Sequence, residues 1–198
     1  MDFAQIKDNL IIKLLGKERN EKLLMEVPHL TYMDLVILFY VYRENREGKP
    51  VATLVYNNRF ENWGRPLDEL YQVARSNTQR LMPSIFITME EALEDLTGAT
   101  FHSAEPVMYV LSNERKCFGA SVLLYENKLN EIGDMIQDDF YILPSSIHEV
   151  IIVPKEKTRD KEELTEMVQQ VNFSQLMEEE VLSDHAYFYS RVENTIYC

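Results

Sequence analysis

Two apolar runs, each closed by a proline, dominate residues 140–154, FYILPSSIHEVIIVP. Residues 140–143 and 150–153 are rich in β-branched and aromatic side chains, which favour strands. The segment between them holds a proline, two serines, His148 and Glu149, and proline with serine is typical of a turn. The stretch therefore predicts a β-hairpin, in which two antiparallel strands follow each other directly.

The same order of elements occurs three times along the chain. In residues 35–81, the apolar run LVILFYVY, a charged turn and a second strand-like run precede a pattern typical of an amphipathic helix. Residues 107–137 and 140–171 repeat this order without residue-level identity. Because hairpins give antiparallel pairing, the sequence predicts an α+β fold. We expect a largely antiparallel sheet built from strand–strand–helix units, with helices mostly on one face.

Local patterns predict the individual elements. Apolar residues at helical spacing indicate an N-terminal helix over residues 3–15 and a second helix over 17–25. Residues 57–66 and 113–119 are expected to be loops. The remaining expected elements are the strands 35–42, 51–56, 84–88, 107–111, 120–124, 140–143, 150–153 and 181–190, and the helices 67–81, 89–96, 125–137 and 161–171.

Length and composition are those of an ordinary folded protein. The chain has 198 residues, of which 45% are hydrophobic, and this suffices for the core of one domain or of two small ones. We expect a helical segment over residues 1–30 and an α+β domain over 31–198. A division of that domain into 31–98 and 105–198 is the alternative.

The charge is strongly acidic, with 33 acidic and 20 basic residues and a formal net charge of −13. This balance argues against nucleic-acid and anionic membrane partners, because both are bound through Lys and Arg. It would suit a basic partner. Two unrelated cysteines, Cys117 and Cys198, fit a reducing compartment, and charges interrupt the N-terminal apolar residues that a signal peptide needs. We therefore expect a cytoplasmic protein.

Several stretches carry a family resemblance. The strings LPSSIHEVIIVP, GASVLLYENKLNEIGDMI, ELTEMVQQVNFSQLMEEEVLSDHAYFYSR, MDLVILFYVY and VYNNRFENWGRPLDELYQVARSNTQRLMP resemble an uncharacterised family of gut-type Gram-positive bacteria, known only as a domain of unknown function. The resemblance covers nearly the whole chain from about Asp2. It implies family membership, and it implies no activity and no catalytic residue.

Nucleophile-type and base-type side chains crowd together only between the two runs of residues 140–154. Ser145 or Ser146 with His148 would suit a small serine-type hydrolase, with Asp184 from another strand as the orienting acid. His185 is the alternative partner there, because neighbouring strand residues face opposite ways. A GxSxG elbow and a glycine-rich turn are both missing. The simpler interpretation, in which the serines hydrogen-bond the backbone of a turn, is therefore favoured.

A polar-aromatic segment and one carboxylate are candidates for a ligand or interface contact. Asn57, Asn58 and Trp63 belong to the first, and Glu149 at the mouth of a strand is the second. Tryptophan is enriched at interfaces. The alternative is a hydrophobic lid over the helix at 67–81, with Gly64 in a left-handed turn.

Metal and cofactor signals are weak. His29 and His102 lack the spacing of convergent ligands, and no phosphate-binding glycine motif occurs, so neither a metal site nor a cofactor is predicted. Aromatic residues cluster at Tyr187–Tyr189. If this strand lies at a sheet edge, it would suit homo-oligomerisation or the addition of a protein partner.

The favoured hypothesis is a cytoplasmic, acidic α+β binding or interaction module that has no catalytic activity. A small serine-type hydrolase that uses Ser146, His148 and Asp184 is the second hypothesis.

Overall fold

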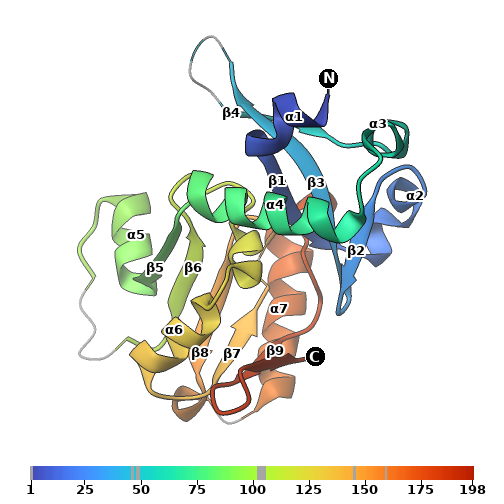
Figure 1. Cartoon of the computed structure of the whole chain (residues 1–198). Coiled ribbons are helices and arrows are strands. Elements are labelled where there is room, and N and C mark those ends of the chain that lie inside the picture. The colour runs from blue at the N-terminus through green and yellow to red at the C-terminus, as the bar shows by residue number, and fades with distance from the viewer. Residues whose placement is uncertain (1, 46, 48–49, 102–105, 145, 159) are drawn as a thin grey trace. The chain divides into compact units, whose positions relative to one another are not determined.

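The computed structural model of the chain describes residues 2–45, 47, 50–101, 106–144, 146–158 and 160–198. The chain divides into two compact units, Met1–Pro83 and Ser84–Cys198. Each unit holds one sheet in which every strand pairing is antiparallel, together with helices, and this confirms the predicted α+β fold (Figure 1). The predicted domain boundaries at residues 31, 98 and 105 stay a prediction.

The first unit is organised around one long strand, β3 (Leu35–Glu44), whose apolar side chains are buried on both faces. β1 (Leu10–Gly16) pairs with one edge of β3, while β2 (His29–Tyr32) and β4 (Pro50–Leu54) share the other edge. The predicted hairpin of β3 and β4 is confirmed. The helices of this unit are α1 (Phe3–Ile6), η1 (Lys7–Asn9), η2 (Glu18–Asn20), α2 (Glu21–Leu24), α3 (Asn57–Trp63) and α4 (Leu67–Leu81).

The prediction of a helix over residues 3–15 is wrong for its second half. A helix is present at Phe3–Ile6, but Leu10–Gly16 is the strand β1 and is buried at every position. The run LIIKLLG is nearly apolar throughout, so its spacing matches a helix and a fully buried strand equally well. These residues form a strand and not a helix because they pair with β3. The helix predicted over 17–25 is present as two short helices, η2 and α2.

Residues 57–66 were expected to be a loop, and this prediction is wrong over Asn57–Trp63, which forms helix α3. Gly64 ends that helix with φ of 58°, which confirms the predicted left-handed turn. The next helix, α4, has the predicted bounds and begins directly after Pro66. Its Thr78 accepts a hydrogen bond from the backbone N–H of Ile12 at 2.9 Å, which holds α4 against β1.

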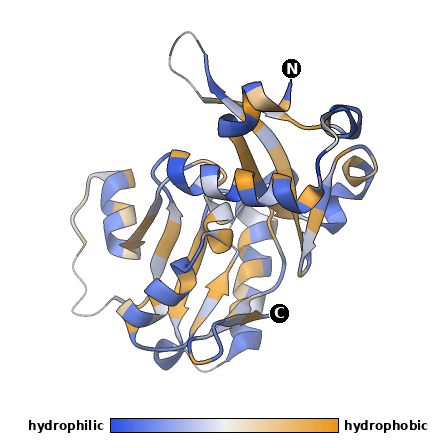
Figure 2. Cartoon of the chain, viewed as in Figure 1, coloured by the Kyte–Doolittle hydropathy of each residue, from blue (hydrophilic) through white to orange (hydrophobic). Residues whose placement is uncertain are grey.

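The second unit contains a six-stranded sheet in the order β10-β9-β7-β8-β6-β5. The hairpin of β7 and β8 pairs Phe140 with Pro154 and Leu143 with Ile151, which confirms the prediction for residues 140–153. Figure 2 shows hydrophobic residues along the strands and hydrophilic stretches on the helices. The strands are β5 (Ser84–Thr88), β6 (Tyr109–Asn113), β7 (Phe140–Leu143), β8 (Val150–Pro154), β9 (Tyr187–Ser190) and β10 (Thr195–Tyr197).

Helices cover both faces of this sheet, whereas the sequence predicted helices mostly on one face. Helix α7 (Lys161–Gln175) packs Leu164 and Val168 against Leu143 and Val153 on one face. Phe140 and Tyr189 lie on the opposite face. Helix α6 (Lys128–Ile136) covers this face, because a Cβ at its Gly133 would lie 3.4 Å from the Tyr189 ring. The other helices of the unit are α5 (Met89–Thr97), η3 (Gly119–Leu124), η4 (Lys155–Lys157) and η5 (Glu178–Glu180).

Two further strand predictions are wrong. Residues 120–124 belong to the buried 3-10 helix η3, because β6 pairs with β5 and β8, so both of its edges are occupied. The strand predicted over 181–190 is limited to β9, which lies between β7 and β10. Tyr187 and Tyr189 are buried, so they do not form an aromatic sheet edge. Among the described residues, no helix combines the length and apolarity that a bilayer crossing needs.

Candidate functional site

Ser146 stabilises the turn between β7 and β8 by two hydrogen bonds within the turn. Ser146 donates its backbone N–H to the carbonyl of Glu149 at 3.2 Å, and its Oγ accepts the backbone N–H of His148 at 3.0 Å. These are the contacts that the turn interpretation requires. Ser145 lies outside the described residues.

The imidazole of His148 bridges two other segments. Its Nδ1 accepts the backbone N–H of Phe118 at 3.1 Å, and its Nε2 lies 3.7 Å from Oε1 of Glu180. The ring also packs on the Phe118 ring, with 5.4 Å between centroids. Because Nδ1 accepts, the proton of the neutral imidazole is assigned to Nε2, which faces the carboxylate.

A tight loop holds the Phe118 amide in place. The buried Asn113 donates to the carbonyl of Cys117 at 2.9 Å and accepts from the backbone N–H of Arg115 at 3.0 Å. Phe118 itself adopts a left-handed conformation with φ of 51°. The following residue, Gly119, has no room for a side chain, because a Cβ there would be 2.3 Å from the carbonyl oxygen of His148.

These contacts give the predicted serine-hydrolase site no support. A nucleophilic serine donates its O–H to a histidine nitrogen. Here both ring nitrogens of His148 face other groups, and the hydroxyl oxygen of Ser146 accepts an amide. The carboxylate of Asp184 accepts from Asn172 on α7 at 2.8 Å. The hydrolase assignment of these residues stays a prediction.

The remaining predicted residues lie apart from this turn. His185 lines a shallow depression with Thr165, Gln169 and Cys198. In the first unit, Asn57 bonds the carbonyl of Met25 through its side chain at 3.1 Å.

Trp63, the aromatic residue of the predicted polar-aromatic segment, packs against Phe3 with 5.7 Å between centroids, and against Phe60. Asn58 accepts from Asn62 through its carbonyl at 2.7 Å. Glu149 is half-buried and closes the turn through its carbonyl. Ligand binding by Asn57, Asn58, Trp63 and Glu149 stays a prediction. Within the part of the chain that the structure describes, no three His, Cys, Asp or Glu side chains gather to hold a metal ion.

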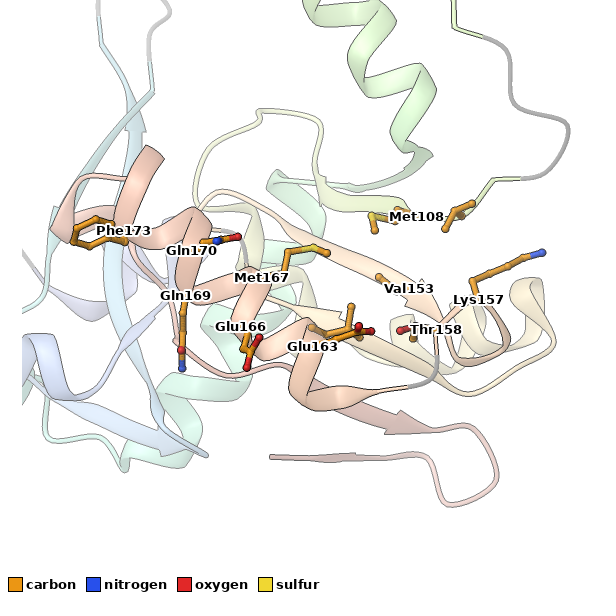
Figure 3. A pocket seen from close by; sticks show the side chains of 12 residues that line it. Met108, Val153, Lys157, Thr158, Glu163, Glu166, Met167, Gln169, Gln170 and Phe173 are labelled. Carbon is orange, nitrogen blue, oxygen red and sulfur yellow. The ribbon is translucent and has the colours of Figure 1, made fainter.

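A groove with a volume of about 730 Å³ runs along α7 (Figure 3). Val153 of β8 and Leu164 of α7, both buried, form its floor. Phe173 stands at one end and Lys157 at the other. The described residues that line it, here called the α7 groove, are Val107, Met108, Val153, Lys157, Thr158, Glu163, Leu164, Glu166, Met167, Gln169, Gln170 and Phe173.

Large apolar side chains in the α7 groove are exposed. Phe173 is 95% exposed, Met167 42% and Val107 45%. The sequence pattern does not reveal this surface, because Leu164, Met167, Val168 and Val171 all fall at helical spacing and together predict the core face of the helix. The sequence signal for an additional apolar surface is the width of the apolar arc on α7, which does not say which side of the arc the sheet covers. Leu164 and Val168 are four residues apart on one stripe, and Met167 begins a second stripe that reaches Gln170 and Phe173.

One of the comparisons with known proteins gives a match. A family model, described as a family of unknown function (DUF5688), matches residues 1–191. No curated protein and no solved structure matches the chain. The chain therefore belongs to this family of unknown function.

Proposed function

We propose that this protein is an interaction module without catalytic activity, and that the α7 groove binds an apolar segment of a protein partner. The observation that carries the proposal is the almost complete exposure of Phe173 at the end of the groove. Burying an aromatic side chain of this size would stabilise a complex, and aromatic residues dominate the energetics of interfaces.

The floor of the groove is rigid, whereas its walls are adaptable. Leu164 and Val153 belong to a buried cluster with Leu143, Val168 and Ala186, so the floor keeps its shape. Met108 and Met167 stand over this floor (Figure 3), and methionine adapts its unbranched side chain to irregular partner surfaces.

The polar lining suits a polypeptide ligand. Gln170 presents a side-chain amide, which both donates and accepts hydrogen bonds, whereas the amide nitrogen of Gln169 donates to the carbonyl of Asp184 at 3.3 Å. The Gln170 amide matches polar side chains at the rim of a complex. Among the lining residues that the structure describes there is no Cys, Ser or His, so these residues do not pair a nucleophile with a histidine base.

A bacterial cytoplasm is the setting that we propose. Both cysteines of the chain are present as thiols, which fits a reducing compartment. The family resemblance of the sequence supports the bacterial origin.

A peptide selection tests the proposed function. A random peptide library on phage is selected against the immobilised full chain, and the selected peptides are then measured by calorimetry. We expect peptides with apolar anchors to bind the natural chain and to lose about tenfold or more in affinity on Phe173→Ser, because a buried aromatic anchor contributes at least about 1.4 kcal/mol.

The matched control is Leu96→Ser on α5, which removes an apolar side chain that is 82% exposed and does not line the groove. Its affinities should equal those of the natural chain. Selection of no binding peptide, or of peptides that bind Phe173→Ser as well as the natural chain, would overturn the proposal.

A further inference from the structure

We infer that the segment bound in the α7 groove is a basic amphipathic helix of a partner protein. This inference rests on the proposed function and specifies the chemistry of its ligand. It follows from the charge of the groove, from the hydrogen bonding of its floor and walls, and from the spacing of its apolar residues.

The charge of the α7 groove and its surroundings is acidic. Glu163 and Glu166 lie on the groove side of α7, and Lys157, the one lysine among the described lining residues, has Glu156 at 3.5 Å from its Nζ. Residues 156–180 carry eight acidic and three basic side chains. A partner with Lys or Arg beside its apolar residues therefore meets complementary charge, which favours encounter and specificity.

The same charge argues against a second copy of this chain as the occupant. The net charge is −13, and α7 itself carries three glutamates and one lysine. Two copies docked through this surface would bring like charges together at the interface, which opposes association.

The backbone around the groove favours a helical ligand. Strand β8, which supplies the floor, is hydrogen-bonded to β7 on one edge and to β6 on the other. The long wall is helix α7, whose backbone groups bond within the helix. Over residues 151–152 both edges of β8 are paired, so a helix, which satisfies its backbone groups internally, fits this groove better than an extended segment that would add a strand.

The apolar residues suit a short amphipathic helix. Glu163 and Phe173 are ten residues apart on α7, which corresponds to about 15 Å of helix axis. A ligand helix of about three turns covers this length. Apolar residues at its positions i, i+4 and i+7 would contact Phe173, Met167 and Met108, the anchors of the α7 groove.

Three synthetic peptides of about 16 residues test the inference against the full chain, because this length covers the groove with a turn to spare. The first is a Leu/Lys amphipathic helix, the second replaces each Lys by Glu, and the third scrambles the Leu/Lys sequence. Binding is followed by fluorescence anisotropy at low and high salt. We expect the first peptide to bind at least about tenfold more tightly than the others, and to weaken as salt screens the charges.

Substitutions in the α7 groove test whether the peptide binds at this surface. Phe173→Ser should weaken the Leu/Lys peptide about tenfold or more. The double substitution Glu163→Gln and Glu166→Gln should weaken it by about threefold to tenfold and reduce its salt dependence. Leu96→Ser and Glu114→Gln, at exposed positions that do not line the groove, are the matched controls and should change neither.

The outcomes separate the two proposals. If library-selected peptides depend on Phe173 but the Glu peptide binds as well as the Lys peptide, the inference fails and the proposed function stands. Equal binding of the scrambled peptide also overturns the inference. If neither selected nor designed peptides depend on Phe173, both proposals fail.

Discussion

The imidazole of His148 accepts a hydrogen bond from the backbone N–H of Phe118, with 3.1 Å between Nδ1 and the amide nitrogen. The two residues lie thirty positions apart. The bond fastens the loop of residues 113–119 to the turn between β7 and β8, and Glu180 adds a third segment at 3.7 Å from Nε2. His148 thus connects three stretches of the second unit.

Replacing this imidazole should lower stability. His148→Phe keeps the aromatic packing on Phe118 but removes the acceptor, so the Phe118 N–H loses its partner. We expect the free energy of unfolding to fall by about 1–3 kcal/mol, measured by urea denaturation. His185→Phe, at an exposed histidine, is the control and should change it by less than about 0.5 kcal/mol. Equal stability of His148→Phe and the natural chain would contradict the structural role.

Gly119 should tolerate no side chain. In Gly119→Ala the new Cβ would approach Oγ of Ser112 to 2.1 Å and the carbonyl oxygen of His148 to 2.3 Å. Because the carbonyl belongs to the backbone, the clash requires the loop or the turn to move. Overpacking of this kind costs about 1–3 kcal/mol or more.

The matched control for this substitution is Gly98→Ala. Gly98 has φ of 70° and open space around it, so only the left-handed backbone opposes a side chain, at about 1–2 kcal/mol. Urea denaturation of both variants gives the comparison. A larger loss for Gly98→Ala than for Gly119→Ala would contradict the close approach at the turn.

Asp139 should make stability depend on pH. The backbone N–H of Arg191 donates to Oδ1 at 3.0 Å, and Lys155 lies 3.1 Å from Oδ2, and together they hold the pKa of this carboxyl below its usual range. A lowered folded pKa means that the carboxylate stabilises the fold above the usual aspartate pKa of about 3.9. This stabilisation is lost as the pH falls through the folded pKa.

Asp139→Asn should therefore lower the free energy of unfolding at pH 7, and the difference from the natural chain should shrink at pH 3. Urea titrations at pH 7, 5 and 3 measure it. Asp95→Asn, which removes an exposed ion pair with Lys116, is the control and should change stability by less than about 0.5 kcal/mol at each pH. A difference for Asp139→Asn that grows on acidification would contradict the prediction.

The two faces of α7 should respond differently to substitution. Leu164→Ala removes a buried side chain and should cost about 2–5 kcal/mol of unfolding free energy. Phe173→Ser should leave the unfolding free energy within about 0.5 kcal/mol, since this side chain is exposed. Thermal and urea unfolding check both values. A loss of more than about 1 kcal/mol for Phe173→Ser would place Phe173 in a packed core and remove the main anchor of the α7 groove.

The sequence predicted correctly those helices and strands whose ends are marked by proline. The hairpin of β7 and β8 follows from two β-type runs that end in prolines, and α4 follows from Pro66 and a clear apolar stripe. β1 and η3 were mispredicted, because LIIKLLG and GASVLL are apolar at nearly every position and have no distinct period. Their structure is decided by distant partners, in particular β3 for β1.

The candidate sites show the same limit. The sequence located the cluster of Ser146 and His148, but it contains no local sign that Phe118 occupies Nδ1 of the imidazole. It also could not separate the exposed Met167 from the buried Leu164, since both are apolar residues of one helix. That distinction depends on which face of α7 the sheet covers.

The position of β9 beside β7 has a consequence for how the chain is made. Because β9 follows β7 and β8 in the sequence but pairs with β7, one edge of β7 has no partner until residues 187–190 have left the ribosome. An open strand edge beside Phe140 and Ile142 is a template for pairing between nascent chains. Polypeptides that terminate before Tyr187 are therefore expected to aggregate during synthesis, and translation speed over the last stretch sets how long that risk lasts.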